Sequence, residues 1–322
     1  MFLIEYNKYF SDKNNIKLIL LNKFYNKNIN VYYSKNINRQ KILYNNKIKN
    51  INKIDCNNNT KIENINNLIN SAELQFEDHK NIDQISFIPL TTYDKIKNIN
   101  HMQNLKILVF STSSKDVNPN NIQKLTGLVE LKCCLIRKIK NINQNLNHMK
   151  NLKKLYCKQK STINQSSIKK ISKLVELDCS WNKKIKNINH MKKLKTLQCF
   201  GFSGIDQNGI NKIIQLKNLN CSFNIKIYDV NHLKNLKKLS CVGNSSIDQK
   251  GISKISKLVE LNCNENEKIK DINHMKNLKI LNCCGRSGLD QIGINKIRKL
   301  VRFTYYGNIK VSCCLNHKKL KY

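Results

Sequence analysis

Two residue types that often carry chemistry, cysteine and histidine, recur at regular places in this sequence of 322 residues. Nine of its 13 cysteines close a short phrase of the form apolar-x-x-apolar-x-Cys, as in LVELDC at 174–179. A thiol at such a place could be a nucleophile, a metal ligand, half of a disulfide or a small apolar side chain. The nine are Cys56, Cys133, Cys157, Cys179, Cys199, Cys221, Cys241, Cys263 and Cys283.

Other copies of the phrase put an aromatic residue at the place of the cysteine. Phe110 closes 105–110 and Tyr305 closes 300–305. A nucleophile or ligand could not be exchanged for phenylalanine and keep its chemistry, whereas a packing residue could. We therefore predict that these thiols fill a core. Strands stacked ~4.8 Å apart could bring neighbouring thiols to disulfide distance in an oxidising medium, and a reducing compartment would keep them as thiols.

Five of the seven histidines recur in one phrase, mostly Asn-His-Met. They occur in alternate repeats, so successive imidazoles would lie ~9–10 Å apart, whereas the ligands of one zinc lie ~2.1 Å from it. They are His101, His148, His190, His232 and His274. The phrase CCLNH at 313–317 offers Cys313, Cys314 and His317, but adjacent cysteines on a strand face opposite ways. The prediction is that the chain holds no metal.

No motif for enzymatic chemistry is found. The sequence has no phosphate-binding glycine loop, no His-Glu-x-x-His and no dinucleotide fingerprint, and its GFSG and GRSG phrases lack the spacing of a nucleophile elbow. We predict a protein that is not an enzyme and that has no cofactor.

The charge is extreme, with 58 Lys and Arg against 21 Asp and Glu and a formal net charge of +37. Such a charge attracts any polyanion at low salt without a dedicated site. It accompanies an abundance of Asn, Ile and Lys, the bias of a coding sequence rich in A and T, so both a compositional and a selected origin stay open.

No export signal or membrane anchor is read from the sequence. Glu5 and Lys8 interrupt the apolar start, and the most apolar later stretch, 16–24, is too short to cross a bilayer. The expected location is intracellular and cytoplasmic.

An internal repeat organises most of the chain. Copies of the phrase begin at residues 174, 194, 216, 236, 258 and 278, so the spacing alternates between 20 and 22 and the unit is a pair of 42 residues. In A-type repeats (from 174, 216, 258 and 300) the phrase is followed by text such as KKIKNINHMKN, which predicts 3₁₀-like turns. In B-type repeats (from 194, 236 and 278) it is followed by text such as SGIDQNGINKI, where Asp206 can cap a helix that buries Ile210 and Ile213.

The same frame predicts the domain organisation. It extends back to about residue 49, so 49–310 is one repetitive body, 1–48 an N-terminal cap or degenerate repeats, and 311–322 a C-terminal tail. Within 66–104 both SAELQF at 71–76 and IDQISF at 82–87 resemble strands, although they lie too close together for two full repeats.

The pattern L-x-x-L-x-[LC]-x-x-N with an apolar return resembles the leucine-rich repeat family over 49–310. A-type repeats are similar to the family's short class, whose returning segments form 3₁₀ turns. B-type repeats are similar to its cysteine-containing class. The Asn and Lys bias resembles repeat proteins of giant viruses that infect amoebae. The family resemblance implies an α/β solenoid with a parallel concave sheet and a convex side that alternates 3₁₀ turns and short α-helices.

The resemblance also implies that the asparagine at the ninth position of a repeat turns inwards and bonds buried backbone groups. Phe202 and Arg286 interrupt this series, so their turns should be looser or use other donors. The asparagines are Asn59, Asn182, Asn224, Asn244, Asn266 and Asn308.

As the resemblance implies, partners dock on the outward positions of the concave sheet. Because this face is mixed in sign and the lysines crowd the returning segments, we predict a protein-interaction scaffold with an unidentified protein partner. Its contact residues would be Glu130, Lys154, Tyr156, Glu176, Asp178, Gln198, Asn220, Lys238 and Glu260, flanked by Trp181 and Phe223.

Two alternatives remain open. One is binding of nucleic acid or another polyanion through the lysine-rich convex and flanking surface, which would weaken steeply with salt. The other is the substrate-recognition part of a ubiquitin-ligase adaptor with 1–48 as a diverged F-box, although 1–48 lacks the expected Leu-Pro start.

Overall fold

The computed structural model describes residues 105–111, 124–134, 146–159 and 161–311, and the strand backbones at 29–32, 51–55 and 73–76. The chain divides into two compact units. The N-terminal unit comprises Met1–Tyr156 and Lys160–Ile171, and the C-terminal unit comprises Cys157–Gln159 and Ser172–Tyr322. The predicted boundaries at 48 and 310 stay predictions.

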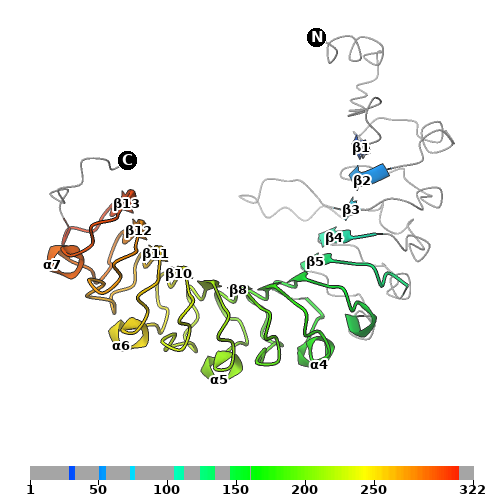
Figure 1. Cartoon of the computed structure of the whole chain (residues 1–322), viewed down its shortest axis with the longest axis horizontal. Coiled ribbons are helices and arrows are strands. Elements are labelled where there is room, and N and C mark those ends of the chain that lie inside the picture. The colour runs from blue at the N-terminus through cyan, green and yellow to red at the C-terminus, as the bar shows by residue number, and fades with distance from the viewer. Residues whose placement is uncertain are drawn as a thin grey trace, which may run out of the picture. The chain divides into compact units, whose positions relative to one another are not determined.

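The N-terminal unit is a run of parallel strands in which each pairs with the next along the chain (Figure 1). β3 coincides with the predicted SAELQF strand, whereas IDQISF lies outside the described residues. Among the described residues of this unit, two short helices accompany the strands, η3 (Leu146–His148) and α4 (Gln165–Ile168). The strands are β1 (Ile29–Tyr32), β2 (Ile51–Asp55), β3 (Glu73–Phe76), β4 (Ile107–Ser111), β5 (Glu130–Cys134) and β6 (Lys154–Tyr156).

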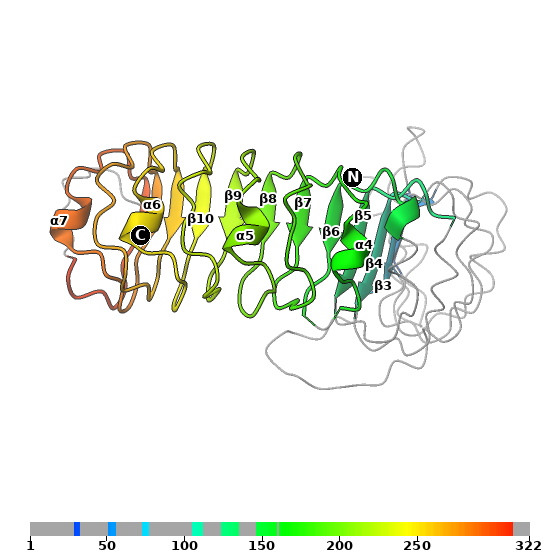
Figure 2. The same ribbon diagram turned by 90° about the horizontal axis from the view of Figure 1, so that it is seen from below.

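The C-terminal unit repeats the same construction with greater regularity. Its strands lie side by side and parallel, paired residue for residue (Figure 2). Within this unit the strands line the inner side of a curve and the helices α5 (Gln207–Ile210), α6 (Gln249–Ile252) and α7 (Gln291–Ile294) the outer side (Figure 1). The strands are β7 (Glu176–Asp178), β8 (Thr196–Gln198), β9 (Asn218–Asn220), β10 (Lys238–Ser240), β11 (Glu260–Asn262), β12 (Ile280–Asn282) and β13 (Arg302–Thr304).

The core of each turn is built from the apolar positions of its repeat, and the predicted role of the thiols is confirmed. Leu194, Leu197 and Cys199 are fully buried in one B-type repeat, as are Ile205 and Ile210 on its returning side. Burying such side chains contributes about 1.5–3 kcal/mol each, which offsets the conformational entropy lost in ordering a turn. Eight of the cysteines at the sixth repeat position are buried and are not in disulfide bonds, and Cys56 lies outside the described residues.

The returning segments follow the two predicted patterns. In B-type repeats the carboxylates of Asp206, Asp248 and Asp290 accept hydrogen bonds from the third helical amides at 2.8, 2.9 and 2.8 Å, which confirms the predicted caps. In A-type repeats, Met191 N–H bonds Ile188 O at 2.9 Å. This bond spans three residues, as in the predicted 3₁₀-like turns.

A buried asparagine ties each A-type repeat to the B-type repeat before it. Asn224 donates from Nδ2 to the carbonyls of Cys199 (3.0 Å) and Ile205 (3.2 Å), and its Oδ1 accepts from the Lys226 amide (2.9 Å). Asn266 and Asn308 make the same three bonds in the next two A-type repeats, which begin at 258 and 300. The inward asparagine predicted by the resemblance is therefore found in the A-type repeats.

The prediction was wrong for Asn244, which is exposed. In B-type repeats a serine at the tenth position is buried instead, and Ser245 Oγ accepts from the amide of Ile247 at 3.3 Å. The physical reason is that the carbonyls of a B-type turn are already bonded by the next A-type asparagine, so an inward side chain is not needed there. In the turns of Phe202 and Arg286, the hydroxyl oxygens of Ser203 and Ser287 likewise accept a hydrogen bond from the amide two residues further on. These turns thus use a serine as acceptor in place of the ninth-position asparagine. Asn59 lies outside the described residues.

Replacing Asn224 by alanine should lower the free energy of unfolding by about 3 kcal/mol, because two buried carbonyls and one amide lose their partner. Asn244→Ala is the matched control, since the same residue type at the same repeat position is solvent-exposed. Urea denaturation followed by the fluorescence of Trp181, the one tryptophan of the sequence, measures both. Equal shifts for the two variants would contradict the assignment of the buried bonds.

Candidate functional site

The outward strand positions of the C-terminal unit form two rows across the sheet, which we call the inner face. Parallel register aligns the third and fifth repeat positions of all seven described strands. The first row is Glu176, Thr196, Asn218, Lys238, Glu260, Ile280 and Arg302, and the second is Asp178, Gln198, Asn220, Ser240, Asn262, Asn282 and Thr304.

Polar side chains on neighbouring strands bond one another across the inner face. Lys238 Nζ lies 2.7 Å from Glu260 Oε2, and Asn218 Nδ2 donates to Thr196 Oγ1 at 3.1 Å. Gln198 and Asn220, on the two strands that carry Thr196 and Asn218, are half-buried amides of the second row. The result is a surface of both charge signs with many groups that can donate and accept hydrogen bonds.

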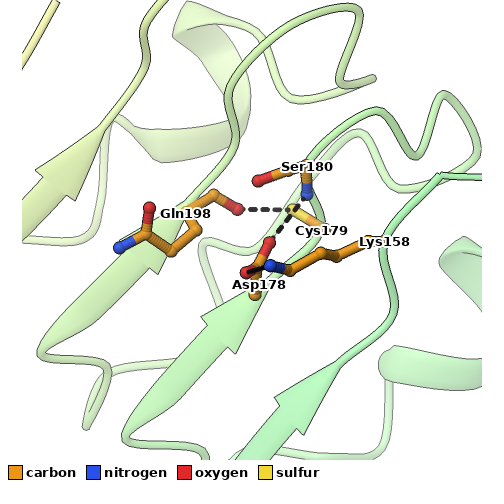
Figure 3. Close-up of polar contacts among 5 residues, drawn as sticks. All are labelled: Lys158, Asp178, Cys179, Ser180 and Gln198. Carbon is orange, nitrogen blue, oxygen red and sulfur yellow. Dashed lines mark hydrogen bonds and ion pairs between the residues drawn. The ribbon is translucent and has the colours of Figure 1, made fainter. Parts of the chain in front are cut away.

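Asp178 differs from its neighbours in the second row because its side chain is buried. It is 4% exposed, and its carboxylate is held by Lys158 Nζ at 2.9 Å and by the Ser180 amide at 3.2 Å (Figure 3). A carboxylate with these partners mainly stabilises the turn after β7. Glu176 on the same strand is half-buried and remains the acidic group that the inner face presents here.

The predicted contact residues of the N-terminal unit form a compact charged cluster. Glu130 is 9% exposed and lies 3.1 Å from Lys132 Nζ and 3.3 Å from Lys154 Nζ. Lys132 also lies 5.3 Å from the centroid of the Tyr156 ring. Lys154 and Tyr156 therefore form the accessible part of this cluster, because the negative charge of Glu130 is paired with two lysine side chains.

The eighth position of each described repeat from 152 onwards has a left-handed backbone, a feature that the sequence analysis missed. Glycine occupies it in B-type repeats, as at Gly201 (φ +68°) and Gly243 (φ +65°). In the A-type repeats from 174, 216 and 258 larger residues adopt it, including Trp181 (φ +61°) and Phe223 (φ +56°), whereas the repeat from 300 has Gly307 there. Such residues avoid this conformation unless their surroundings impose it. The sequence signal that could have revealed this backbone conformation is the glycine that recurs every 42 residues in the B-type repeats.

Packing explains the alternation at this position. The ring of Trp181 lies so close to Gly201 that a Cβ there would clash with it, and Phe223 covers Gly243 in the same way. Trp181 also makes edge contacts with Phe200 and Phe202, at centroid distances of 6.3 and 5.3 Å. Even so, Trp181 is 40% and Phe223 50% exposed. These two rings, which we call the aromatic rim, follow the carboxyl ends of β7 and β9.

The recurring thiols are unsuited to chemistry. Burial raises the pKa of Cys179, Cys221 and Cys283 to about 12, so thiolate is scarce at neutral pH. The Sγ atoms of Cys179 and Cys221 each donate to a carbonyl of the next strand at 3.6 Å.

Two of the repeated histidines are likewise structural. His232 and His274 place Nε2 at 3.2 and 3.0 Å from the carbonyls of Ile210 and Ile252. Burial lowers the pKa of His232, which favours its neutral form. Within the described ranges no three His, Cys, Asp or Glu side chains gather to hold a metal ion. The CCLNH cluster and His101 lie outside those ranges.

The parallel strands, their alternating short helices and the inward asparagines define the fold as a leucine-rich repeat solenoid. Two solved proteins of Listeria monocytogenes share it. An internalin, InlF, is 21% identical with a TM-score of 0.54, over 87% of this chain and 73% of that one. The functional domain of InlJ, described as including a cysteine ladder, is 19% identical with a TM-score of 0.58, over 87% of this chain and 62% of its own. The chain thus spans less than two thirds of the InlJ domain.

No protein-family model matches the sequence, and the comparison with curated proteins finds no match. None of the helices in the described part of the chain has the length and apolarity that a membrane crossing requires.

Gly201→Ala should cost about 3 kcal/mol of stability and displace the Trp181 ring, because the new methyl group adds a clash to a left-handed backbone. Gly307→Ala is the control: its φ is +72°, but a Cβ there meets nothing closer than 3.6 Å, so it should cost about 1 kcal/mol. A red shift of the tryptophan emission in the first variant alone would support the packing, and unchanged emission in both would contradict it.

Cys221 should resist alkylation in the folded protein at pH 8 and react only in urea, because its thiol is buried and its pKa is raised. Half-exposed Cys284 provides the internal control and should react first. Mass spectrometry of the digested protein locates the label. A folded-state pKa of about 12 also means that the stability from the protonated thiol is present below pH ~8.5 and lost as the pH rises towards 12. Reaction of Cys221 as fast as Cys284 would refute the core role.

Proposed function

We propose that this protein is a non-enzymatic protein-interaction scaffold that binds a protein partner on the inner face, against the aromatic rim. One observation carries the proposal. Two partly exposed rings, Trp181 and Phe223, are held in strained backbone positions at the edge of a sheet whose polar groups are fixed in register. Rigid aromatic side chains beside adaptable polar groups are typical of residues that anchor protein interfaces.

The inner face favours a protein over a polyanion. Its charges oppose each other, as in the pair of Lys238 and Glu260, and Gln198 and Asn220 offer both donors and acceptors. Because the strands hold these groups in place before binding, little side-chain entropy would be lost on association. Of the predicted contact residues, Glu176, Gln198, Asn220, Lys238 and Glu260 suit this role, whereas Asp178 stabilises the sheet.

We further propose that the protein works inside a cell. The described cysteines at the sixth repeat position stack in successive turns without forming disulfide bonds, which suits a reducing compartment. The Asn- and Lys-rich composition also supports an origin in a giant virus of amoebae, with the host cytoplasm as the place of action. The partner would then be a host or viral protein.

The combined variant Trp181→Ala with Phe223→Ala should reduce partner capture at least about tenfold, because hot-spot residues contribute ~2 kcal/mol or more each. The matched control replaces Tyr228 and Ile292, which are 57% and 74% exposed on returning segments. The immobilised chain is incubated with lysate of its source cell, with and without nuclease treatment, and recovered proteins are quantified by mass spectrometry at about 150 and 500 mM salt.

The proposal predicts proteins that the wild type and the control recover at both salt concentrations and that the rim variant loses. Glu176→Lys, on the same face, should weaken capture of the same proteins. Recovery that is equal for both double variants, or that nuclease abolishes, would contradict a protein interface on the inner face.

A further inference from the structure

The positive charge of the C-terminal unit is concentrated at one edge of its sheet. In every described turn, lysines stand in the segment that leads from the return into the strand. Because the strands are parallel, these segments all lie at the same edge, beside the amino-terminal ends of the strands. We call this the lysine edge. It comprises Lys173, Lys192, Lys193, Lys195, Lys212, Lys217, Lys234, Lys237, Lys254, Lys257, Lys276, Lys279, Lys296, Arg298 and Lys299, all of them exposed.

The distribution of charge in this unit is strongly uneven. Residues 172–311 hold 26 Lys and Arg and 10 Asp and Glu. Fifteen of the basic residues and none of the acidic ones belong to the lysine edge, which leaves 11 basic and 10 acidic residues for the rest. A compositional bias alone would spread lysine over all exposed positions. The rest of the unit is instead almost neutral, so nearly the whole excess lies along one strip.

The backbone of the lysine edge is held in place by asparagines from the A-type returns. Asn231 donates from Nδ2 to Lys250 O at 2.7 Å, and its Oδ1 accepts from the Lys254 amide at 2.7 Å. Asn189 and Asn273 bond the next B-type return in the same way. Every second turn of the strip is thus fixed to its neighbour, so its charges keep a regular spacing.

The chemistry of the strip indicates what it would bind. It contains 14 lysines, one arginine and no aromatic residue, so it offers point charges for phosphates but no ring for stacking on bases. Its seven turns are spaced ~4.8 Å apart and span ~29 Å. The positive charges of the strip therefore have a density of about one per 2 Å along it. Duplex nucleic acid carries about one charge per 1.7 Å of its axis, whereas a single strand carries about one per 3.4 Å.

We propose that the lysine edge binds the phosphate backbone of duplex nucleic acid without reading its sequence. The density and the length of the strip match about one turn of a duplex, and the lack of aromatic side chains disfavours an unstacked single strand. The corresponding segments of the N-terminal unit carry Lys106, Lys124, Lys150 and Lys153, all exposed and without acidic neighbours in the same segments. This surface differs from the inner face, so the proposal does not rest on a protein partner.

Four substitutions test it: Lys195→Gln, Lys217→Gln, Lys237→Gln and Lys279→Gln, which remove one charge from each of four turns. The matched control removes four exposed lysines from elsewhere in the same unit: Lys183→Gln, Lys250→Gln, Lys270→Gln and Lys310→Gln. Both variants keep the same net charge. Binding to 24-base-pair DNA and RNA duplexes is measured by fluorescence anisotropy from about 50 to 300 mM salt, after circular dichroism has verified that both variants are folded.

The edge variant should bind the duplexes at least about tenfold more weakly at ~150 mM salt, and its slope of log affinity against log salt should fall by about 3. The control and the aromatic-rim variant should bind as the wild type does. Equal weakening in the edge and control variants would show attraction by net charge alone and would overturn the proposal. Tighter binding to a single strand of the same sequence, or to vesicles of anionic lipid, would also overturn it.

Discussion

Every turn of a stacked coil leaves backbone carbonyls in its interior, and those carbonyls must be bonded without water. In the C-terminal unit the asparagines of the A-type repeats from 216, 258 and 300 each bond two carbonyls of the B-type repeat before them, as Asn224 does for Cys199 and Ile205. The rest of the structure depends on this arrangement. It joins the repeats into pairs, and it explains why the sequence period is 42 residues even though one turn takes about half of that.

The same pairing governs the surface. At the eighth repeat position an A-type side chain covers a B-type glycine, so the aromatic rim exists because alternate turns leave room for it. The asparagines of the A-type returns likewise fix the backbone of the lysine edge in alternate turns. Two surfaces of different character, a mixed polar face with aromatic residues and a basic strip, are thus produced by one two-turn pattern.

The sequence predicted much of the fold, because its signals were local and repeated. Cys179 recurs with the same spacing as other core residues, and Asp206 stands just before a short apolar helix, so the roles of both followed from position alone. Asn244 was assigned wrongly because the rule for a ninth-position asparagine ignores which carbonyls the next repeat already bonds. That information lies in the pairing between turns.

The candidate site was harder to predict than the core. The ion pair that buries Asp178 joins it to Lys158, which belongs to the preceding repeat, and no spacing rule indicates such a contact. The aromatic rim depends on left-handed backbone at Trp181 and Phe223, which a residue type other than glycine does not reveal. The crowded lysines could be recognised in the sequence, but only the parallel strands showed that their segments, which contain no acidic residue, lie together at one edge.

The alternation at the eighth position also restricts how such an array can change its length. If a single turn were deleted between Trp181 and Phe223, two large side chains in left-handed conformation would meet where a ring now rests on glycine. Gain or loss of two turns at once preserves every such contact. Duplications and deletions in the gene should therefore survive selection in steps of 42 codons, and the parity of the repeats should be kept in any longer or shorter descendant.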